Sequence, residues 1–120
     1  MVGIKVVSTG HAVPDKVVTN DDLSRVVDTN DEWIYSKTGI KERHFCENET
    51  NWELALKAAD TAIERAGIDK SEIGMLIVAT FTPDYATPSI ACVLHEKMGL
   101  RTDIPSFDLN AACAGYVYCL

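Results

Sequence analysis

The residues best suited to chemistry lie near the end of the chain, where Cys113 stands within the run Phe107–Tyr116. A β-prone stretch gives way there to a helical pattern, and alanines and a glycine flank the cysteine, so the chain can turn tightly as in a nucleophile elbow. A thiol at the start of a helix lies near the positive end of the helix dipole, which stabilises the thiolate. Such a thiolate can attack a thioester while nearby backbone N–H groups hold the developing oxyanion. A structural cysteine in a tight turn fits the same placement equally well.

Three further cysteines raise the question of a disulfide framework or a metal site. An even number of cysteines can indicate disulfides, but in a reducing compartment unpaired cysteines behave as small hydrophobic residues. The sequence has no Cys-x-x-Cys pair and no histidine at ligand spacing from a cysteine, so it predicts no metal site. Cys46, Cys92 and Cys119 are therefore expected to be structural, and the three histidines are expected to be surface or capping residues: His11, His44 and His95.

Composition narrows the class of protein. The chain has 120 residues, of which 47% are hydrophobic and 24% charged, and its formal net charge is -7. These values are typical of a globular domain, and the excess of acid argues against binding to nucleic acid. The N-terminal run Met1–Ser8 is too short for a secretory leader, and no stretch approaches the ~20 apolar residues of a membrane helix. The sequence therefore predicts a cytoplasmic protein.

Helix and strand signals alternate along the first part of the chain. Ile4 to Ser8 is β-prone and is predicted to form the first strand. Three Thr-x-x-acid boxes predict helix starts at Thr19, Thr29 and Thr50, because the hydroxyl accepts from an orphan N–H while the acid reaches back. The third box opens a helix that Gly67 ends, with one stripe of mostly small residues: Trp52, Ala55, Ala59, Ala62, Ile63 and Ala66.

The second part of the chain continues this alternation. Met75–Thr80 is continuously apolar, which predicts a strand covered on both faces. Pro88 is expected at the first position of a helix that Gly99 stops. Ile104–Leu109 is predicted to form another strand, and Ala111–Leu120 the start of a further helix. Alternating strands and helices indicate an α/β domain. Because the sequence stops within a helical pattern, the chain is expected to be incomplete as a folding and catalytic unit.

Several segments, in order and across nearly all 120 residues, resemble the N-terminal part of β-ketoacyl-acyl-carrier-protein synthase III. The matching segments are Val17–Leu23, Asp28–Ile34, Thr38–Arg43, Ile77–Thr80, Pro88–Cys92, Phe107–Leu109 and Ala111–Gly115. The resemblance implies a thiolase-like α/β fold, with a mixed sheet covered by helices, of which residues 1–120 form the N-terminal half-domain and carry the nucleophilic cysteine. The C-terminal half would be absent from this chain.

The resemblance also implies a two-step acyl transfer. Cys113 accepts an acyl group, typically acetyl, from coenzyme A; malonyl-acyl-carrier protein then loses carbon dioxide, and its carbanion attacks the cysteinyl thioester. This reaction starts type II fatty-acid synthesis and needs no permanently bound cofactor, because acyl-coenzyme A is a substrate. The family's histidine and asparagine, which assist the second step, belong to the C-terminal half.

Three residues would contact the nucleotide by the same resemblance. Trp33 matches a tryptophan that stacks on the coenzyme A adenine, although a core tryptophan is the commoner case. Thr29 matches a position near that nucleotide, but its hydroxyl is also a candidate helix cap. Lys37 stands where the family usually has arginine, and so keeps the charge without the planar fork. A basic island extends from it in an otherwise acidic chain: Lys37, Lys41, Arg43 and His44.

The remaining expectations concern primer choice, partners and rival functions. The loop Pro83–Pro88 matches a segment that reaches the partner's acyl pocket in family homodimers, and Thr87 is smaller than the aromatic residue often found there, which would admit longer or branched primers. Expected partners are acyl-coenzyme A, malonyl-acyl-carrier protein, a second copy and the C-terminal half, but neither nucleic acid nor membrane. Two alternatives stay open: a related condensing enzyme of secondary metabolism, and a truncated, non-catalytic subunit that binds acyl-coenzyme A.

Overall fold

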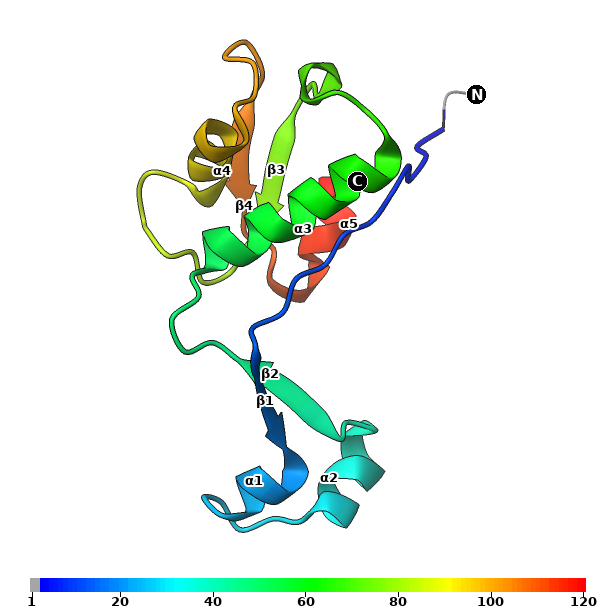
Figure 1. Cartoon of the computed structure of the whole chain (residues 1–120), viewed down its shortest axis with the longest axis vertical. Coiled ribbons are helices and arrows are strands. Elements are labelled where there is room, and N and C mark those ends of the chain that lie inside the picture. The colour runs from blue at the N-terminus through cyan, green and yellow to red at the C-terminus, as the bar shows by residue number, and fades with distance from the viewer. Residues whose placement is uncertain (1–2) are drawn as a thin grey trace. The chain divides into compact units, whose positions relative to one another are not determined.

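The computed structural model describes residues 3–120, in which helices alternate with short strands (Figure 1). Met1 and Val2, which begin the N-terminal run considered above, lie outside the described residues. The chain divides into two compact units. Unit 1 combines the described residues up to Ala12 with Thr50–Leu120, and unit 2 is Val13–Glu49. No helix within residues 3–120 is long and apolar enough to cross a membrane.

Unit 1 is built around a strand–helix–strand element. Strand β3 (Leu76–Ala79) pairs in parallel with β4 (Ser106–Leu109), with Leu76 opposite Ser106, and helix α4 (Ile90–Met98) lies on the connection between them. The other elements of unit 1 are helix α3 (Asn51–Ala66), the 3-10 turns η1 (Lys70–Glu72) and η2 (Ala112–Ala114), and the short helix α5 (Gly115–Cys119). This is the strand and helix alternation that the sequence predicts.

The core of unit 1 lies between α4, α3 and one face of β3. Its buried members are Ile90, Leu94, Met98, Leu100 and Ile104. Alternate strand residues Leu76 and Val78 pack on this cluster, and so do Trp52, Ala55, Leu56, Ala59 and Ile63 of α3. On the strand's other face, a Cβ added to Gly115 would lie 3.0 Å from Cβ of Ala79, so α5 approaches β3 closely. Helices therefore lie against both faces of β3, as expected of an apolar parallel strand.

Helix ends in unit 1 are fixed by caps near and far in sequence. Thr50 and Glu53 form the predicted capping box of α3, and Gly67 ends the helix in the left-handed conformation with φ 64°. Two carboxylates from other segments add to these caps: Asp84 accepts from the amides of Asn51 and Trp52, and Asp108 of β4 accepts from those of Ile90 and Ala91. The second contact ties the start of α4 to the strand that leads to Cys113.

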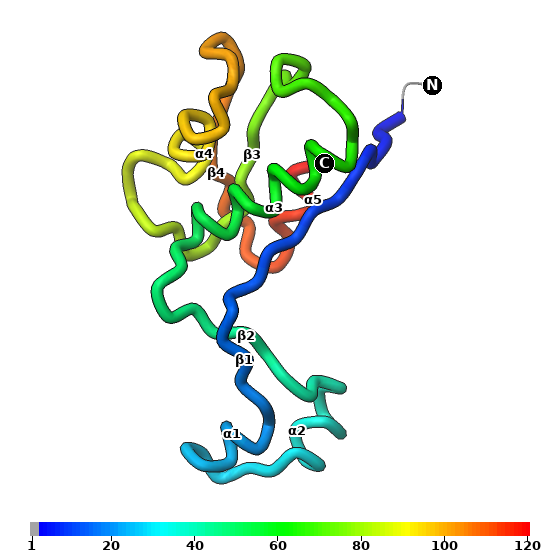
Figure 2. The backbone as a smooth tube through the Cα atoms, in the orientation of Figure 1, coloured from blue at the N-terminus to red at the C-terminus, as the bar shows by residue number. Residues whose placement is uncertain are grey.

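Residues 3–12 run as an extended chain along α3 (Figures 1 and 2). Ser8 Oγ donates to the Ala62 carbonyl at 2.6 Å, and a Cβ on Gly10 would collide with the Ala58 carbonyl oxygen. The prediction of a strand at Ile4–Ser8 is wrong within the described residues, because no neighbouring strand supplies ladder hydrogen bonds. A β-prone sequence without a partner strand stays extended but unpaired.

Unit 2 consists of a two-stranded ribbon and two short helices. Strand β1 (Lys16–Thr19) pairs antiparallel with β2 (Glu42–Phe45). Helix α1 (Asn20–Ser24) begins at the predicted Thr19/Asp22 capping box, and α2 (Asp31–Thr38) follows it. The apolar core is small, since Val18 and Ile34, each 9% exposed, are its buried apolar side chains.

Three predicted boundaries shift. Asn30, not Thr29, caps α2, because its side chain accepts from the Trp33 amide. Pro88 lies outside α4 rather than at its first position, since Ser89 is the N-cap and accepts from the Cys92 amide. The segment expected to begin one helix at Ala111 forms the turn η2 before α5 begins.

The α/β class is confirmed, while the sheet differs in detail. The parallel pair in unit 1 and the antiparallel pair in unit 2 are separate two-stranded sheets within residues 3–120, rather than one mixed sheet. A single half-domain spanning residues 1–120 remains a prediction beside the observed division into two units.

Candidate functional site

Cys113 lies in the turn η2, directly after strand β4. The preceding residue, Ala112, has a φ of 45°, a left-handed conformation that is strained for a residue with a Cβ. This kink separates the strand from α5 and leaves Cys113 exposed. The predicted tight strand-to-helix turn is therefore present, but the thiol sits in a 3-10 turn ahead of a five-residue helix rather than in a regular first turn.

Backbone amides around the thiol are used within the turn itself. The Ala114 amide donates to the Ala111 carbonyl at 2.9 Å, the Ala112 amide to Asn110 Oδ1 at 3.3 Å, and the Gly115 amide to the Ala112 carbonyl. These hydrogen bonds hold the turn rigid. They also occupy three of the backbone donors near the thiol.

An apolar hollow opens beside the thiol. It measures about 370 Å³ and is lined by Phe81, Ala112 and Cys113. Phe81 is 70% exposed, and its ring forms the bulky wall of the hollow. An apolar space next to a reactive thiol suits the hydrocarbon part of an acyl group. The expectation for Thr87 concerned the acyl pocket of a partner copy, whereas the aromatic residue that lines this hollow is Phe81.

The other cysteines lack this setting. All four thiols are free, and Cys92 makes a weak contact of 3.8 Å from its Sγ to the Ser106 carbonyl. His95, one of the histidines expected to be surface or capping residues, bonds through Nδ1 to Ser106 Oγ at 2.7 Å. Within residues 3–120 no group of three or more potential ligands lies close enough together to hold a metal ion.

The second group of candidate residues lies in unit 2, on helix α2. Trp33 is 58% exposed, so it is not a core residue within this unit. A hollow of about 290 Å³ surrounds it, lined by Asn30, Glu32, Trp33 and Ser36. A flat, exposed indole bordered by polar side chains is a surface on which a nucleobase can stack.

The backbone of Trp33 is fixed by its two neighbours in this hollow. Asn30 Oδ1 accepts from the Trp33 amide at 2.8 Å, and Ser36 Oγ donates to the Trp33 carbonyl at 2.8 Å. Both neighbours were missed from the sequence, although an asparagine just before a helical segment is itself a capping signal. They leave the indole ring as the free part of the residue.

In the sequence, Thr29 directly precedes and Lys37 directly follows the residues that line this hollow. The Thr29 hydroxyl does not cap α2; its oxygen is buried and has no hydrogen-bond partner among the described residues. Lys37 is exposed, in the last turn of α2, where a cation also complements the helix dipole. It stands four residues after Trp33, so the two side chains share one helix face.

The basic island separates into different roles. Arg43 donates to the Val18 carbonyl at 3.1 Å and to Asn20 Oδ1 at 2.5 Å, and His44 Nδ1 bonds to the Pro14 carbonyl at 2.6 Å. Lys41 places its ammonium 5.4 Å from the centre of the Tyr35 ring. Arg43 and His44 are thus engaged in the fold, whereas Lys37 and Lys41 are both exposed and neither forms an ion pair with a described residue.

The candidate residues therefore fall into two groups. Cys113 belongs to unit 1, whereas Thr29, Trp33 and Lys37 belong to unit 2. Unit 1 offers a thiol beside an apolar hollow, and unit 2 offers an exposed indole with a cation one turn away. Both features have a place in chemistry on an acyl thioester of a nucleotide.

Two curated relatives with a similar sequence carry the same name. The chain is 50% identical over 120 residues to β-ketoacyl-[acyl-carrier-protein] synthase III of Clostridium acetobutylicum, covering all of this chain and 37% of that protein. It is 51% identical over 116 residues to the protein of that name in Acholeplasma laidlawii, covering 96% of this chain and 37% of the relative. The chain thus spans little more than a third of the curated relatives it matches. No protein-family model matches it.

Solved structures agree with the sequence relatives. The crystal structure of 3-oxoacyl-[acyl-carrier-protein] synthase III from Aquifex aeolicus superposes with a TM-score of 0.90 at 40% identity, over 97% of this chain and 37% of that one. The priming β-ketosynthase of the R1128 polyketide pathway superposes with a TM-score of 0.88 at 33% identity, over 96% of this chain and 34% of that one.

Proposed function

We propose that this chain, which corresponds over its whole length to the N-terminal part of β-ketoacyl-[acyl-carrier-protein] synthase III, supplies the nucleophile and a nucleotide contact of such an enzyme. The observation that carries the proposal is the exposed Cys113 beside an apolar hollow, at a strand-to-turn kink. The active protein would contain this chain together with the C-terminal part that its relatives possess, and is called the full-length protein below.

In the first step the Cys113 sulfur attacks the carbonyl carbon of an acyl-coenzyme A. The new carbon–sulfur bond replaces the bond to coenzyme A, which leaves as a thiol with the proton that Cys113 gives up. The acyl chain enters the hollow against Phe81, the adenine stacks on Trp33, Thr29 lies near the nucleotide, and Lys37 faces a phosphate. Acetyl or another short acyl group is the cargo, and no permanently bound cofactor takes part.

In the second step malonyl-acyl-carrier protein loses carbon dioxide. The resulting carbanion attacks the Cys113 thioester, a carbon–carbon bond forms, and the cysteine leaves as a thiolate, giving 3-oxoacyl-acyl-carrier protein. The histidine and asparagine that assist this step belong to the C-terminal part. We further propose that the protein is a cytoplasmic homodimer that initiates type II fatty-acid synthesis.

Mass spectrometry of the full-length protein tests the first step. After incubation with acetyl-coenzyme A, an acetyl group should appear on the peptide that contains Cys113. The peptides that contain Cys46 and Cys92 are internal controls, because both thiols are also exposed. An adduct spread over all three thiols, or absent from Cys113, would refute the assignment.

A second candidate function is the priming of a polyketide pathway. The likeness to the R1128 priming β-ketosynthase favours it, although the identity of 33% is lower than the 50% to the fatty-acid relatives. A truncated subunit that binds acyl-coenzyme A without condensing is the other rival. Product analysis with malonyl-acyl-carrier protein separates them: the carrier of fatty-acid synthesis should be the better second substrate, a polyketide carrier would indicate the priming enzyme, and no condensation would indicate the binding subunit.

A further inference from the structure

One buried amide holds unit 2 together. Among residues 3–120, Asn20 is the one polar residue that is buried, with 1% of its surface exposed. Its Nδ2 donates to Asp31 Oδ1 at 2.7 Å and to the Ile40 carbonyl at 2.8 Å, while its Oδ1 accepts from Arg43 Nη2 at 2.5 Å. Its backbone amide donates to the Lys41 carbonyl at 3.1 Å. Both side-chain donor hydrogens and the carbonyl oxygen of the amide have partners, so a side chain without them would leave buried groups unpaired.

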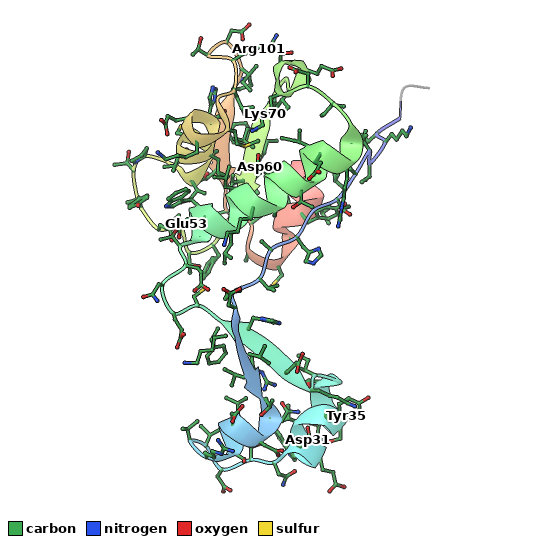
Figure 3. All side chains as sticks on the ribbon, in the orientation of Figure 1. Asp31, Tyr35, Glu53, Asp60, Lys70 and Arg101 are labelled. Atoms are coloured by element: carbon green, nitrogen blue, oxygen red, sulfur yellow. The ribbon has the colours of Figure 1, made fainter. Side chains whose placement is uncertain are left out.

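These partners lie at the two ends of helix α2. Asp31 is its first residue (Figure 3), and Ile40 directly follows Gly39, the left-handed residue that ends the helix. A single side chain therefore fixes where α2 begins and where the chain leaves it. The unit has little else for this purpose, because Val18 and Ile34 are its buried apolar residues. Apolar contacts are non-directional and tolerate sliding, whereas hydrogen bonds of this length fix a position.

Helix α2 is also the support of Trp33. Asn30 and Ser36 hold the backbone of Trp33 but belong to the same helix or its cap, so they move with it. The position of the indole in unit 2 is thus set by whatever fixes the two ends of α2. We infer that Asn20 is a positioning residue for acyl-coenzyme A, acting through Trp33 rather than by contact with the ligand. The inference rests on the proposed function, in which Trp33 stacks on the adenine.

Steady-state kinetics of the full-length protein provide the test. Asn20→Ala should raise KM for acetyl-coenzyme A on the order of ten-fold, since small misplacements of a binding group have large effects. At saturating acetyl-coenzyme A, kcat should stay within about two-fold, because the thiol of unit 1 is untouched. Val18→Ala is the matched control: it removes apolar volume from the same unit without changing the bonds at either end of α2, and should lower stability with KM unchanged.

A polarity exchange distinguishes positioning from general stability. Asn20→Asp alone should be the most damaging change, because it sets a carboxylate against Asp31. Combining it with Asp31→Asn restores a donor and an acceptor between the two positions and keeps the acceptor for Arg43, so KM should recover in part. Asp31→Ala removes one of the two hydrogen bonds by which Asn20 holds the ends of α2. This variant replaces Asn20→Ala in the test if Asn20→Ala does not fold, and it should raise KM by a smaller factor.

A double-mutant cycle with Trp33→Ala completes the design. If Asn20 acts through the indole, Asn20→Ala should add little to the rise in KM that Trp33→Ala causes alone. A rise in KM for Trp33→Ala with an unchanged KM for Asn20→Ala, or full additivity of the two, overturns the inference and leaves the proposed function standing. An unchanged KM for Trp33→Ala overturns the proposed adenine contact itself.

Discussion

Unit 1, which carries Cys113, and unit 2, which carries Trp33, are held together by different interactions. In unit 1 a cluster of apolar side chains lies between α4, α3 and β3, and Ile90 at its centre has no exposed surface. In unit 2 two apolar side chains are buried, and the amide of Asn20 connects α1, α2 and β2 through hydrogen bonds.

The difference suits the two tasks proposed for them. A close-packed core keeps a kinked turn such as the one before Cys113 in place, because it resists any change of volume. A polar network specifies the position of a surface helix without needing a large core. Substitutions in the core of unit 1 should therefore act mainly through stability, and substitutions of Asn20 or Trp33 in unit 2 mainly through ligand binding.

Removal of the thiol should have the largest effect. Cys113→Ser should lower the condensation rate of the full-length protein roughly a thousand-fold or more, because a serine hydroxyl has no accessible anion near neutral pH. Cys92→Ser should leave the rate near normal, since Cys92 is exposed and makes one weak contact. Condensation assays of both variants decide this, and a serine variant at position 113 that retained near-normal turnover would exclude Cys113 as the nucleophile.

Truncation of the core compares the stability of the two units directly. Ile90→Ala should cost about 2–5 kcal/mol, as large-to-small changes in packed cores do. Val18→Ala in unit 2 should cost about 1.5 kcal/mol, the transfer free energy of two buried carbon groups. Denaturant unfolding of the two variants measures both values. Equal losses would mean that unit 2 depends on apolar packing as much as unit 1 does.

Local signals were enough to predict four helix ends. The boxes at Thr19 and Thr50 and the left-handed glycines Gly67 and Gly99 act within one helical turn, so the sequence alone contains the interaction. The box at Thr29 failed because Asn30, an equally good cap, stands beside it, and only the path of the chain chooses between them.

Features that depend on distant contacts could not be predicted in this way. The strand at Ile4–Ser8 needs a partner strand, which no local pattern supplies. Phe81 lies beside Cys113 in the fold, although the two residues are far apart in the sequence. Asn20 looked like part of a helix start, yet its partners lie 11, 20 and 23 residues further along the chain. The turn at Cys113 was predictable because its small residues are contiguous.

Loss of the indole tests whether unit 2 acts through binding. Trp33→Ala should weaken acetyl-coenzyme A binding by roughly 1–3 kcal/mol, the range for one base–aromatic stack. Its melting temperature should change little, because the side chain is 58% exposed. Lys37→Arg should hold or improve binding by restoring the planar fork. A large fall in melting temperature with unchanged KM would show that Trp33 is structural instead.

A change at Phe81 should alter choice of acyl group rather than overall activity. Phe81→Ala enlarges the hollow beside Cys113, so the ratio of kcat/KM for butyryl- over acetyl-coenzyme A should rise about ten-fold, within the range for a few methylenes. Thr87→Ala is the rival variant, since Phe81 lines the hollow beside Cys113, whereas the resemblance places Thr87 at the partner's acyl pocket. An unchanged ratio for Phe81→Ala, or a larger change for Thr87→Ala, would return the choice of primer to the Pro83–Pro88 loop.

The smallest effect concerns a carboxylate at the boundary of unit 2. Hydrogen bonds from backbone amides lower the pKa of Glu49 from 4.5 to about 2. The amide of Glu47 has the largest effect, followed by those of Glu49 itself, Asp15 and Asn48. Because the folded pKa is the lower one, the carboxylate stabilises the folded state above about pH 4.5, and this contribution is lost as the pH falls toward 2. Glu49→Gln should therefore lower the free energy of unfolding at pH 6, with a difference from the parent protein that shrinks toward zero near pH 2.

Glu47→Gln is the matched control, because the Glu47 carboxylate pairs with the Lys16 ammonium on the surface at 2.6 Å, and such exposed pairs contribute little. Unfolding curves between pH 2 and 6 measure both variants, and a Glu49→Gln difference that stayed constant across that range would show that these hydrogen bonds do not favour the charged form.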